Sequence, residues 1–226
     1  MRRVITLSLA LFTAALGWGE SALWNGAVRS FARNEVWQPG LIRVRFDQFN
    51  RRGEQISSSR SLLQVTVDEN GELQTTVIES EEEGEDEESS GGPPFGDDDN
   101  AFAVLQISPF DPAAQDRVEA RATGETRTIR GRQATAFAYT VTGEGRRNAV
   151  GTAWLATDSG APLLLETSIE PLPVYLESFF ASQSFGGNDD RWTADALSFE
   201  ANVRFLLIRR RIESALEFSD YFRYQE

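Results

Sequence analysis

The chain has 226 residues, of which 35 are acidic and 22 basic, and its formal net charge at neutral pH is -13. It contains no Cys and no His, and every basic residue is Arg. These absences exclude disulfides, Ser-His, Cys-His and Ser-Lys catalytic pairs, Schiff-base chemistry and the usual zinc ligands. Only carboxylate and carbonyl oxygens are left for a hard cation such as calcium, and no cofactor is expected.

The exclusive use of Arg has two explanations. Genomic base composition is the favoured one. The other is phosphate recognition, because a guanidinium binds phosphate through two parallel hydrogen bonds where an ammonium acts as a point charge.

The N-terminus has the pattern of an export signal. Arg2 and Arg3 precede an apolar run over residues 4–16, and small residues follow at Gly17 and Gly19. The run is shorter than the roughly 20 residues that span a bilayer as a helix. We therefore predict a cleaved signal peptide over residues 1–19 and a periplasmic mature protein, with a retained membrane anchor as the alternative.

The remaining residues, 20–226, suit a single domain. Leu23, Ala27, Val28 and Phe31 recur at helical spacing, and Ser21 is placed to cap the amino end, which predicts a helix over residues 21–34.

A strand with one wet face is predicted over residues 42–47. Arg43 and Arg45 alternate there with apolar residues, and they are expected to face solvent, with a lipid head group as the alternative partner. A hairpin follows, in which residues 63–67 and 73–77 flank a turn at Asp68–Gly71, since Asn-Gly is a strong hairpin signal.

Residues 79–100 form an acidic segment. Eleven carboxylates and no Arg lie between Glu79 and Asp99, together with Gly, Ser and Pro, so the segment is predicted to be a disordered insertion. A calcium loop is the alternative, but the acid spacing of an EF-hand is absent. Without this segment and the two signal-peptide arginines, 24 acids face 20 bases, and nucleic acid is not an expected partner.

The rest of the chain is predicted to be a run of antiparallel strands, because short apolar stretches alternate with Gly-containing turns and leave no room for crossover helices. We predict a mainly β fold: a large curved antiparallel sheet, an open or half β-barrel, with the N-terminal helix covering its concave side. The expected strands span residues 102–107, 118–122, 126–129, 133–141, 149–157, 163–169, 174–185, 197–208 and 212–218.

Several short motifs resemble the LolA-like superfamily of outer-membrane lipoprotein-sorting and lipoprotein-carrier proteins. The similarity spans roughly residues 105–222, and the acidic insertion is not part of the superfamily pattern. It is carried by Gly151-Thr152-Ala153-Trp154-Leu155, Asp158-Ser159-Gly160-Ala161-Pro162-Leu163, Ile129-Arg130-Gly131, Pro171-Leu172-Pro173, Trp192 and Phe218-Ser219-Asp220-Tyr221. The resemblance implies a half-barrel that holds acyl chains, often those of a lipoprotein in transit, on an apolar concave face.

The expected function is therefore non-catalytic binding or carriage of a lipid or lipoprotein in the periplasm. Lipid or lipoprotein acyl chains are the expected ligand, with transient membrane contact. The candidate ligand-binding residues, for which ordinary core packing is the alternative, are Trp24, Phe31, Phe137, Trp154, Phe199 and Phe205.

Two other functions stay open. In the first, the protein is an envelope sensor or assembly module whose acidic segment binds a basic protein partner. In the second, it is an enzyme with carboxylate-only chemistry, such as a two-acid glycosidase, although no recognisable carboxylate pair supports this.

Overall fold

The computed structural model describes residues 21–84, 103–143, 145, 147–188, 191–205 and 208–224, and for Phe205 it describes the backbone alone. The predicted signal peptide, residues 1–19, lies outside these ranges, as does the acidic segment from Glu85 onward. The helix over residues 21–34 has its predicted bounds.

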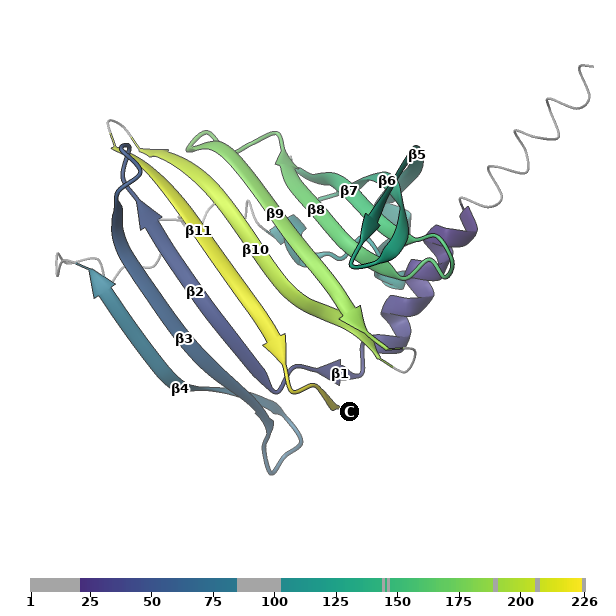
Figure 1. Ribbon diagram of the computed structural model, residues 1–226, viewed down its shortest axis with the longest axis horizontal. Coiled ribbons are helices and arrows are strands. Elements are labelled where there is room, and N and C mark those ends of the chain that lie inside the picture. The colour runs from purple at the N-terminus through teal and green to yellow at the C-terminus, as the bar shows by residue number, and fades with distance from the viewer. Residues whose placement is uncertain are drawn as a thin grey trace, which may run out of the picture.

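Within the described ranges, ten strands form one antiparallel sheet, and β1 and β12 pair beside it (Figure 1). Two short 3-10 helices, η1 (Ala103–Gln106) and η2 (Pro112–Arg117), precede β5. The strands are β1 (Trp37–Gln38), β2 (Leu41–Phe49), β3 (Gln55–Val67), β4 (Leu73–Gly84), β5 (Val118–Ile129), β6 (Arg132–Thr142), β7 (Asn148–Ala156), β8 (Pro162–Glu170), β9 (Leu176–Gly187), β10 (Trp192–Phe205), β11 (Ile208–Ser219) and β12 (Phe222–Arg223).

The strand order is β4-β3-β2-β11-β10-β9-β8-β7-β6-β5. The strands run as a meander from β5 to β11. Strand β11 then pairs with β2, so that the N-terminal strands β2 to β4 and the meander form one sheet. Consecutive strands β4 and β5 form the two opposite edges and do not pair with each other in the described ranges. The predicted fold class, a curved antiparallel sheet that is not closed into a barrel, is confirmed.

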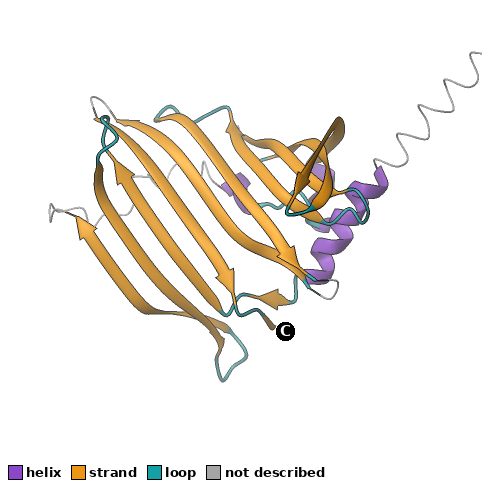
Figure 2. Cartoon of the chain, viewed as in Figure 1, coloured by secondary structure: helices purple, strands orange, loops and turns teal. Residues whose placement is uncertain are grey.

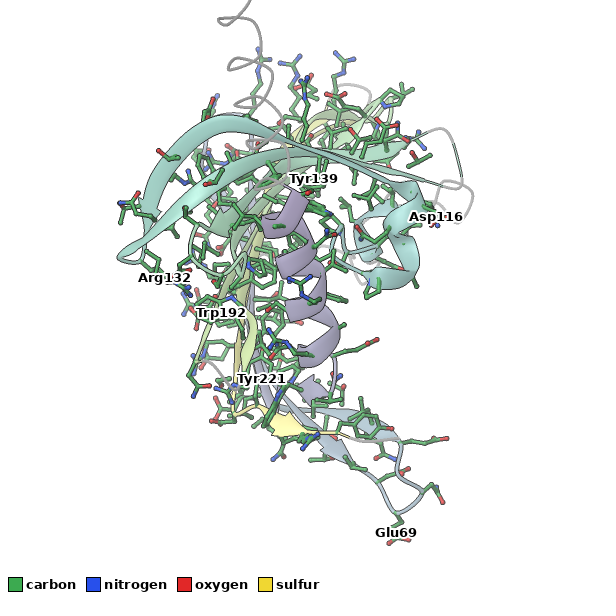
Figure 3. The ribbon with its side chains drawn as sticks, turned by 90° about the vertical axis from the view of Figure 1, so that its right-hand side faces the viewer. Glu69, Asp116, Arg132, Tyr139, Trp192 and Tyr221 are labelled. Atoms are coloured by element: carbon green, nitrogen blue, oxygen red, sulfur yellow. The ribbon has the colours of Figure 1, made fainter. Side chains whose placement is uncertain are left out.

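The sheet has an inner face that carries the N-terminal helix and an outer face on the opposite side. Figure 2 shows the helix at one end of the sheet, and Figure 3 shows the β5–β6 end of the sheet arching over it. Register shifts within the β5–β6, β7–β8 and β9–β10 pairs bend the sheet locally, because an extra residue on one strand increases the local twist.

The predicted hairpin and wet strand are both present. Gly71 has φ 86°, and the Asp68 amide donates to the Glu72 carbonyl oxygen at 2.9 Å, which closes the turn between β3 and β4. Arg43 and Arg45 lie exposed on the outer face, where Arg43 contacts Glu217 at 3.2 Å and Arg45 contacts Asp47 at 2.6 Å. Both arginines are solvent-exposed, as predicted.

Three strand predictions differ from the structure. The strand predicted over residues 197–208 ends at Phe205, and Ile208 begins the next strand, β11. Residues 103–106 form η1 instead of a strand, because Val104 turns into the core beneath the helix. Residues 118–122 and 126–129 belong to one strand, β5, since Gly124, at φ 82°, is accommodated in a register shift between Ala122 and Thr126.

The acidic segment begins inside the sheet, which corrects its predicted start. β4 continues to Gly84, and Glu81 lies opposite Arg60 of β3. Backbone pairing with β3 and this opposite-charge pair order residues 79–84 in spite of their charge. As an edge strand, β4 leaves its carboxylates in solvent, where they also oppose pairing with other chains.

Candidate functional site

One half of the inner face is filled by the protein's own side chains. They form a group, here named the helix cluster, that consists of Trp24, Ala27, Val104, Phe110, Phe137, Tyr139, Val141, Ala149, Ala153, Leu155, Leu165 and Phe185. The helix contributes Trp24 and Ala27, which pack against β6 to β9 and against Phe110. The Trp24 ring centroid lies 5.2 Å from that of Phe110 and 5.8 Å from that of Phe137, and the Trp24 indole N–H donates to Gln115 Oε1 at 3.1 Å. The helix therefore covers the concave side as predicted, but over this half only.

Three of the six candidate ligand-binding residues belong to this packed half. Phe137 is 2% exposed and Trp24 is 8% exposed, while Phe31 is partly buried against the same cluster. Their contacts are those of a hydrophobic core, so ordinary packing accounts for all three.

Trp154 does not lie on the inner face, and its prediction as a concave-face residue was wrong. Its strand neighbours Ala153 and Leu155 point into the helix cluster, so alternation along β7 turns Trp154 to the outer face. There its indole N–H donates to Glu166 Oε2 at 2.8 Å, and the Arg127 guanidinium lies 3.8 Å from the ring centroid. Trp154 thus anchors an outer-face contact between β5, β7 and β8.

Phe199 lies on the inner face, in a second cluster, the central cluster, formed by Ile169, Leu176, Phe179, Ala201 and Ile212. The rings of Phe179 and Phe199 are stacked, with centroids 6.4 Å apart. Leu105 of η1 packs against both the helix cluster and the central cluster, which places the two clusters on the same face. Phe205 belongs to β10, but its side chain lies outside the described part.

Next to the central cluster, three adjacent strands present a strip of partly buried apolar side chains, here named the apolar strip. Residues that face one another across the strands lie on the same side of the sheet, and Val44, Leu216 and Leu197 form one such row. No residue of the helix over 21–34 packs in the central cluster within the described ranges. The strip consists of Ile42, Val44 and Phe46 of β2, Leu216 and Phe218 of β11, and Leu197 and Phe199 of β10.

Most of the strip was absent from the candidate residues. The alternating pattern in each strand was visible in the sequence, but it does not show that β11 inserts between β2 and β10. That pairing alone turns three separate apolar faces into one surface.

Burial also sets the chemistry of one inner-face hydroxyl. Tyr139 is 4% exposed, and burial raises the pKa of its phenol well above the ordinary value. Its hydroxyl lies 2.5 Å from Thr167 Oγ1, so the neutral phenol has a partner. In the described ranges, no three acidic side chains come together in a way that could hold a metal ion. No helix in those ranges is long and apolar enough to cross a membrane.

Comparison with known proteins gave structural similarities alone. No family model and no curated protein sequence matches the chain. An outer-membrane lipoprotein-sorting protein domain from Vibrio parahaemolyticus is 13% identical with a TM-score of 0.40, over 86% of this chain and 89% of that one. A LolA-superfamily protein from Nitrosomonas europaea is 11% identical with a TM-score of 0.37, over 88% and 94%.

A third structure, MucB in complex with the periplasmic part of MucA, is 9% identical with a TM-score of 0.25, over 91% of this chain and 99% of that one. The chain is thus similar to structures that bear the name of the superfamily its motifs resemble. At these identities and TM-scores, no residue role, ligand or partner is carried over to this chain.

Proposed function

We propose that the mature protein is a non-catalytic periplasmic carrier that holds acyl chains of a lipid or lipoprotein on the apolar strip. The observation that carries this proposal is the strip itself: seven apolar side chains, in register on three neighbouring strands, that are only partly buried. An acyl chain laid on them would gain about 0.8 kcal/mol for each buried CH₂ group. No catalytic group is needed for that function.

The dimensions of the strip suit such a ligand. The strip extends along β2 from Ile42 to Phe46, which is about 14 Å at the usual rise per strand residue. That length is close to half the thickness of a bilayer's hydrocarbon core, which is about 30 Å. The central cluster borders one side of the strip, and β3 borders it on the other with Ser59 and Ser61 opposite Phe46 and Val44. A polar border of this kind would leave room for the head of an amphipathic molecule.

The test is a binding measurement with a fluorescent fatty acid on purified mature protein. Leu216→Gln places an amide in the middle of the strip and should weaken binding roughly tenfold or more, since a Leu contact is worth about 1.5–3 kcal/mol. Phe180→Gln is the matched control, because Phe180 is 48% exposed on the outer face, and it should bind like the wild type. Equal affinities of the two variants would overturn the proposal.

Membrane contact would use the end of the sheet at which β10 ends, β11 begins and the β8–β9 connection lies (Figure 1). Val174 is 95% exposed there and Ile208 is 55% exposed, and the Arg204 amide of β10 donates to the Tyr175 carbonyl oxygen at 2.8 Å, which ties the β8–β9 connection to β10. Arg209 and Arg210 follow Ile208 directly. Exposed aliphatic side chains beside arginines are suited to the surface of an anionic bilayer.

A further inference from the structure

A pocket of about 530 Å³ lies at the opposite end of the sheet, where the helix ends. Elements far apart in the sequence form it: the helix end, β1, β12, the first residue of β6, the β7–β8 turn and the start of β10. We name it the arginine pocket, after Arg33, Arg132 and Arg223 in its lining. In Figure 3, Arg132, Trp192 and Tyr221 lie beside the helix, one below the other from its middle to its lower end. Of these three, Arg132 and Trp192 line the pocket.

The lining of the arginine pocket is positively charged. Three arginines line it, and none of its described lining residues is acidic. Arg33 and Arg223 are exposed and have no carboxylate partner among the described residues. Arg132 is the exception, because its guanidinium contacts Asp158 Oδ1 at 2.7 Å.

The walls of the pocket are held in place by hydrogen bonds. Asn34 Oδ1 accepts from the Trp192 backbone N–H at 2.7 Å, and the Trp192 indole N–H donates to the Pro162 carbonyl oxygen at 2.6 Å. Arg132 donates to Ser159 Oγ at 3.0 Å, and its guanidinium lies 5.0 Å from the ring centroid of Trp192. A site that is already ordered loses less entropy when a ligand binds.

A second cavity, of about 750 Å³, adjoins the arginine pocket and shares Arg132, Asn188 and Trp192 with it. Arg130 and Arg191 line it too. Arg130 is paired with Asp195, whereas the Arg191 guanidinium lies over two aromatic rings, 5.1 Å from the centroid of Tyr221 and 5.7 Å from that of Trp37. Basic and aromatic side chains therefore continue beyond the first pocket, where Asp195 and Asp220 also line the cavity.

We infer that the arginine pocket binds the phosphate group of an organic phosphate. Guanidinium groups match phosphate oxygens with two parallel hydrogen bonds each, and Trp37 and Trp192 offer apolar surface to the organic part. The volume lies in the usual range for small-molecule sites and is large for a bare phosphate ion. The helix dipole places a partial negative charge of only about half an elementary charge at the carboxyl end of the helix, which repels an anion weakly. The Asn34 side-chain amide donates to the Ser30 carbonyl oxygen at 2.6 Å, so that this oxygen is already hydrogen-bonded.

The phosphate group could come from a lipid head group or from a soluble phosphoester, and both present the same chemistry to the arginines. None of the residues that line the arginine pocket belongs to the apolar strip. The inference is therefore separate from the proposed acyl-binding function, and Leu216→Gln should leave phosphate binding unchanged.

The test titrates the mature protein with glycerol 3-phosphate by calorimetry and, in parallel, with phosphatidylglycerol vesicles against phosphatidylcholine vesicles by sedimentation. The double variant Arg33→Gln/Arg223→Gln should lose at least tenfold in affinity for whichever phosphate probe binds. The control is Arg29→Gln, one helical turn before Arg33, which is also exposed but does not line the pocket. It should bind like the wild type.

The outcomes distinguish the two sources of the phosphate group. Binding of glycerol 3-phosphate identifies a soluble phosphoester, and binding of phosphatidylglycerol vesicles alone identifies a lipid head group. The inference is overturned if neither probe binds, or if the double variant and Arg29→Gln lose the same affinity.

Discussion

At the scale of single residues, Trp154 shows how one step along a strand changes a role. Ala153 points into the helix cluster and Trp154 points away from it, so the same aromatic side chain supports the outer face instead of meeting a ligand. Its contacts with Glu166 and Arg127 tie together three strands near one edge of the sheet. An aromatic residue in a strand is thus expected to be buried, but the side of the sheet on which it lies depends on how the strand is placed against the neighbouring strands.

Trp154→Phe should lower the free energy of unfolding without weakening acyl binding. The variant removes the hydrogen bond to Glu166 and should lower the free energy of unfolding by about 1–2 kcal/mol. The loss should not be larger, because the partly exposed Glu166 carboxylate can hydrogen-bond to water instead. Urea unfolding measures the first effect and fatty-acid titration the second. A folded variant with tenfold weaker acyl binding would contradict the outer-face position.

Tyr139 makes stability sensitive to alkaline pH. Its pKa is raised in the folded state by burial, so the unfolded chain loses the phenolic proton first as pH rises through the ordinary tyrosine value of 10.0. The free energy of unfolding should therefore fall above about pH 10, where the folded state holds more protons. Tyr221, whose pKa burial also raises, should add to this fall.

Urea unfolding at pH 8 and pH 11 checks this pH dependence against Tyr139→Phe. The variant loses the contact with Thr167 Oγ1 at both pH values, but it should lose less stability between them than the wild type. An equal pH dependence in the two proteins would show that Tyr139 ionises normally.

At the scale of elements, the helix can sit on the sheet because two glycines meet. A Cβ on Gly26 would lie 2.8 Å from the Ser159 carbonyl oxygen, and one on Gly160 would clash with the Leu23 carbonyl oxygen. Gly160 also has φ 73°, which disfavours any other residue. The helix and the β7–β8 turn are therefore in direct backbone contact.

Gly26→Ala should destabilise the protein although it favours the helix. Alanine gains about 1 kcal/mol over glycine inside a helix, but the added methyl must push the helix off backbone atoms, at a cost of roughly 1–3 kcal/mol. Asn25→Ala, at an exposed position of the same helix, should be neutral or stabilising. Urea midpoints of the two variants make the comparison, and a stabilised Gly26→Ala would contradict the close contact.

At the scale of the whole molecule, the chain order places apolar and charged surfaces at different ends of one sheet. The apolar strip depends on β11 pairing with β2, the arginine pocket gathers six elements at one end, and the exposed Val174 and Ile208 lie at the other. The protein could therefore meet a bilayer with one end while its inner face stays accessible.

Val174→Asp should reduce binding to phosphatidylglycerol vesicles at least several-fold, since a charge replaces the most exposed aliphatic side chain of that end. Vesicle flotation measures the change. Val77→Asp is the matched control, because Val77 is 58% exposed on the edge strand β4. Equal loss in both variants would show that this end has no special role in membrane contact.

The predictability of the site differed among its residues. Leu197, Leu216 and Val44 each stood in a clear alternating pattern, so the existence of an apolar face was predictable. Their gathering in one row was not, because register and strand order depend on long-range pairing. Arg33, Arg132 and Arg223 carried no shared signal, since each lies 91 or more positions from the next along the chain.

The sequence by itself determined the mainly β class, the early helix, the Asn-Gly hairpin and the absence of thiol and imidazole chemistry, because periodicity, turn residues and composition are local properties. Only the tertiary structure decided that β4 continues into the acidic segment, that Trp154 faces outward, and that the apolar strip and the arginine pocket exist. These features require residues far apart in the chain to meet, and their positions follow from backbone pairing across the sheet, which no local pattern encodes.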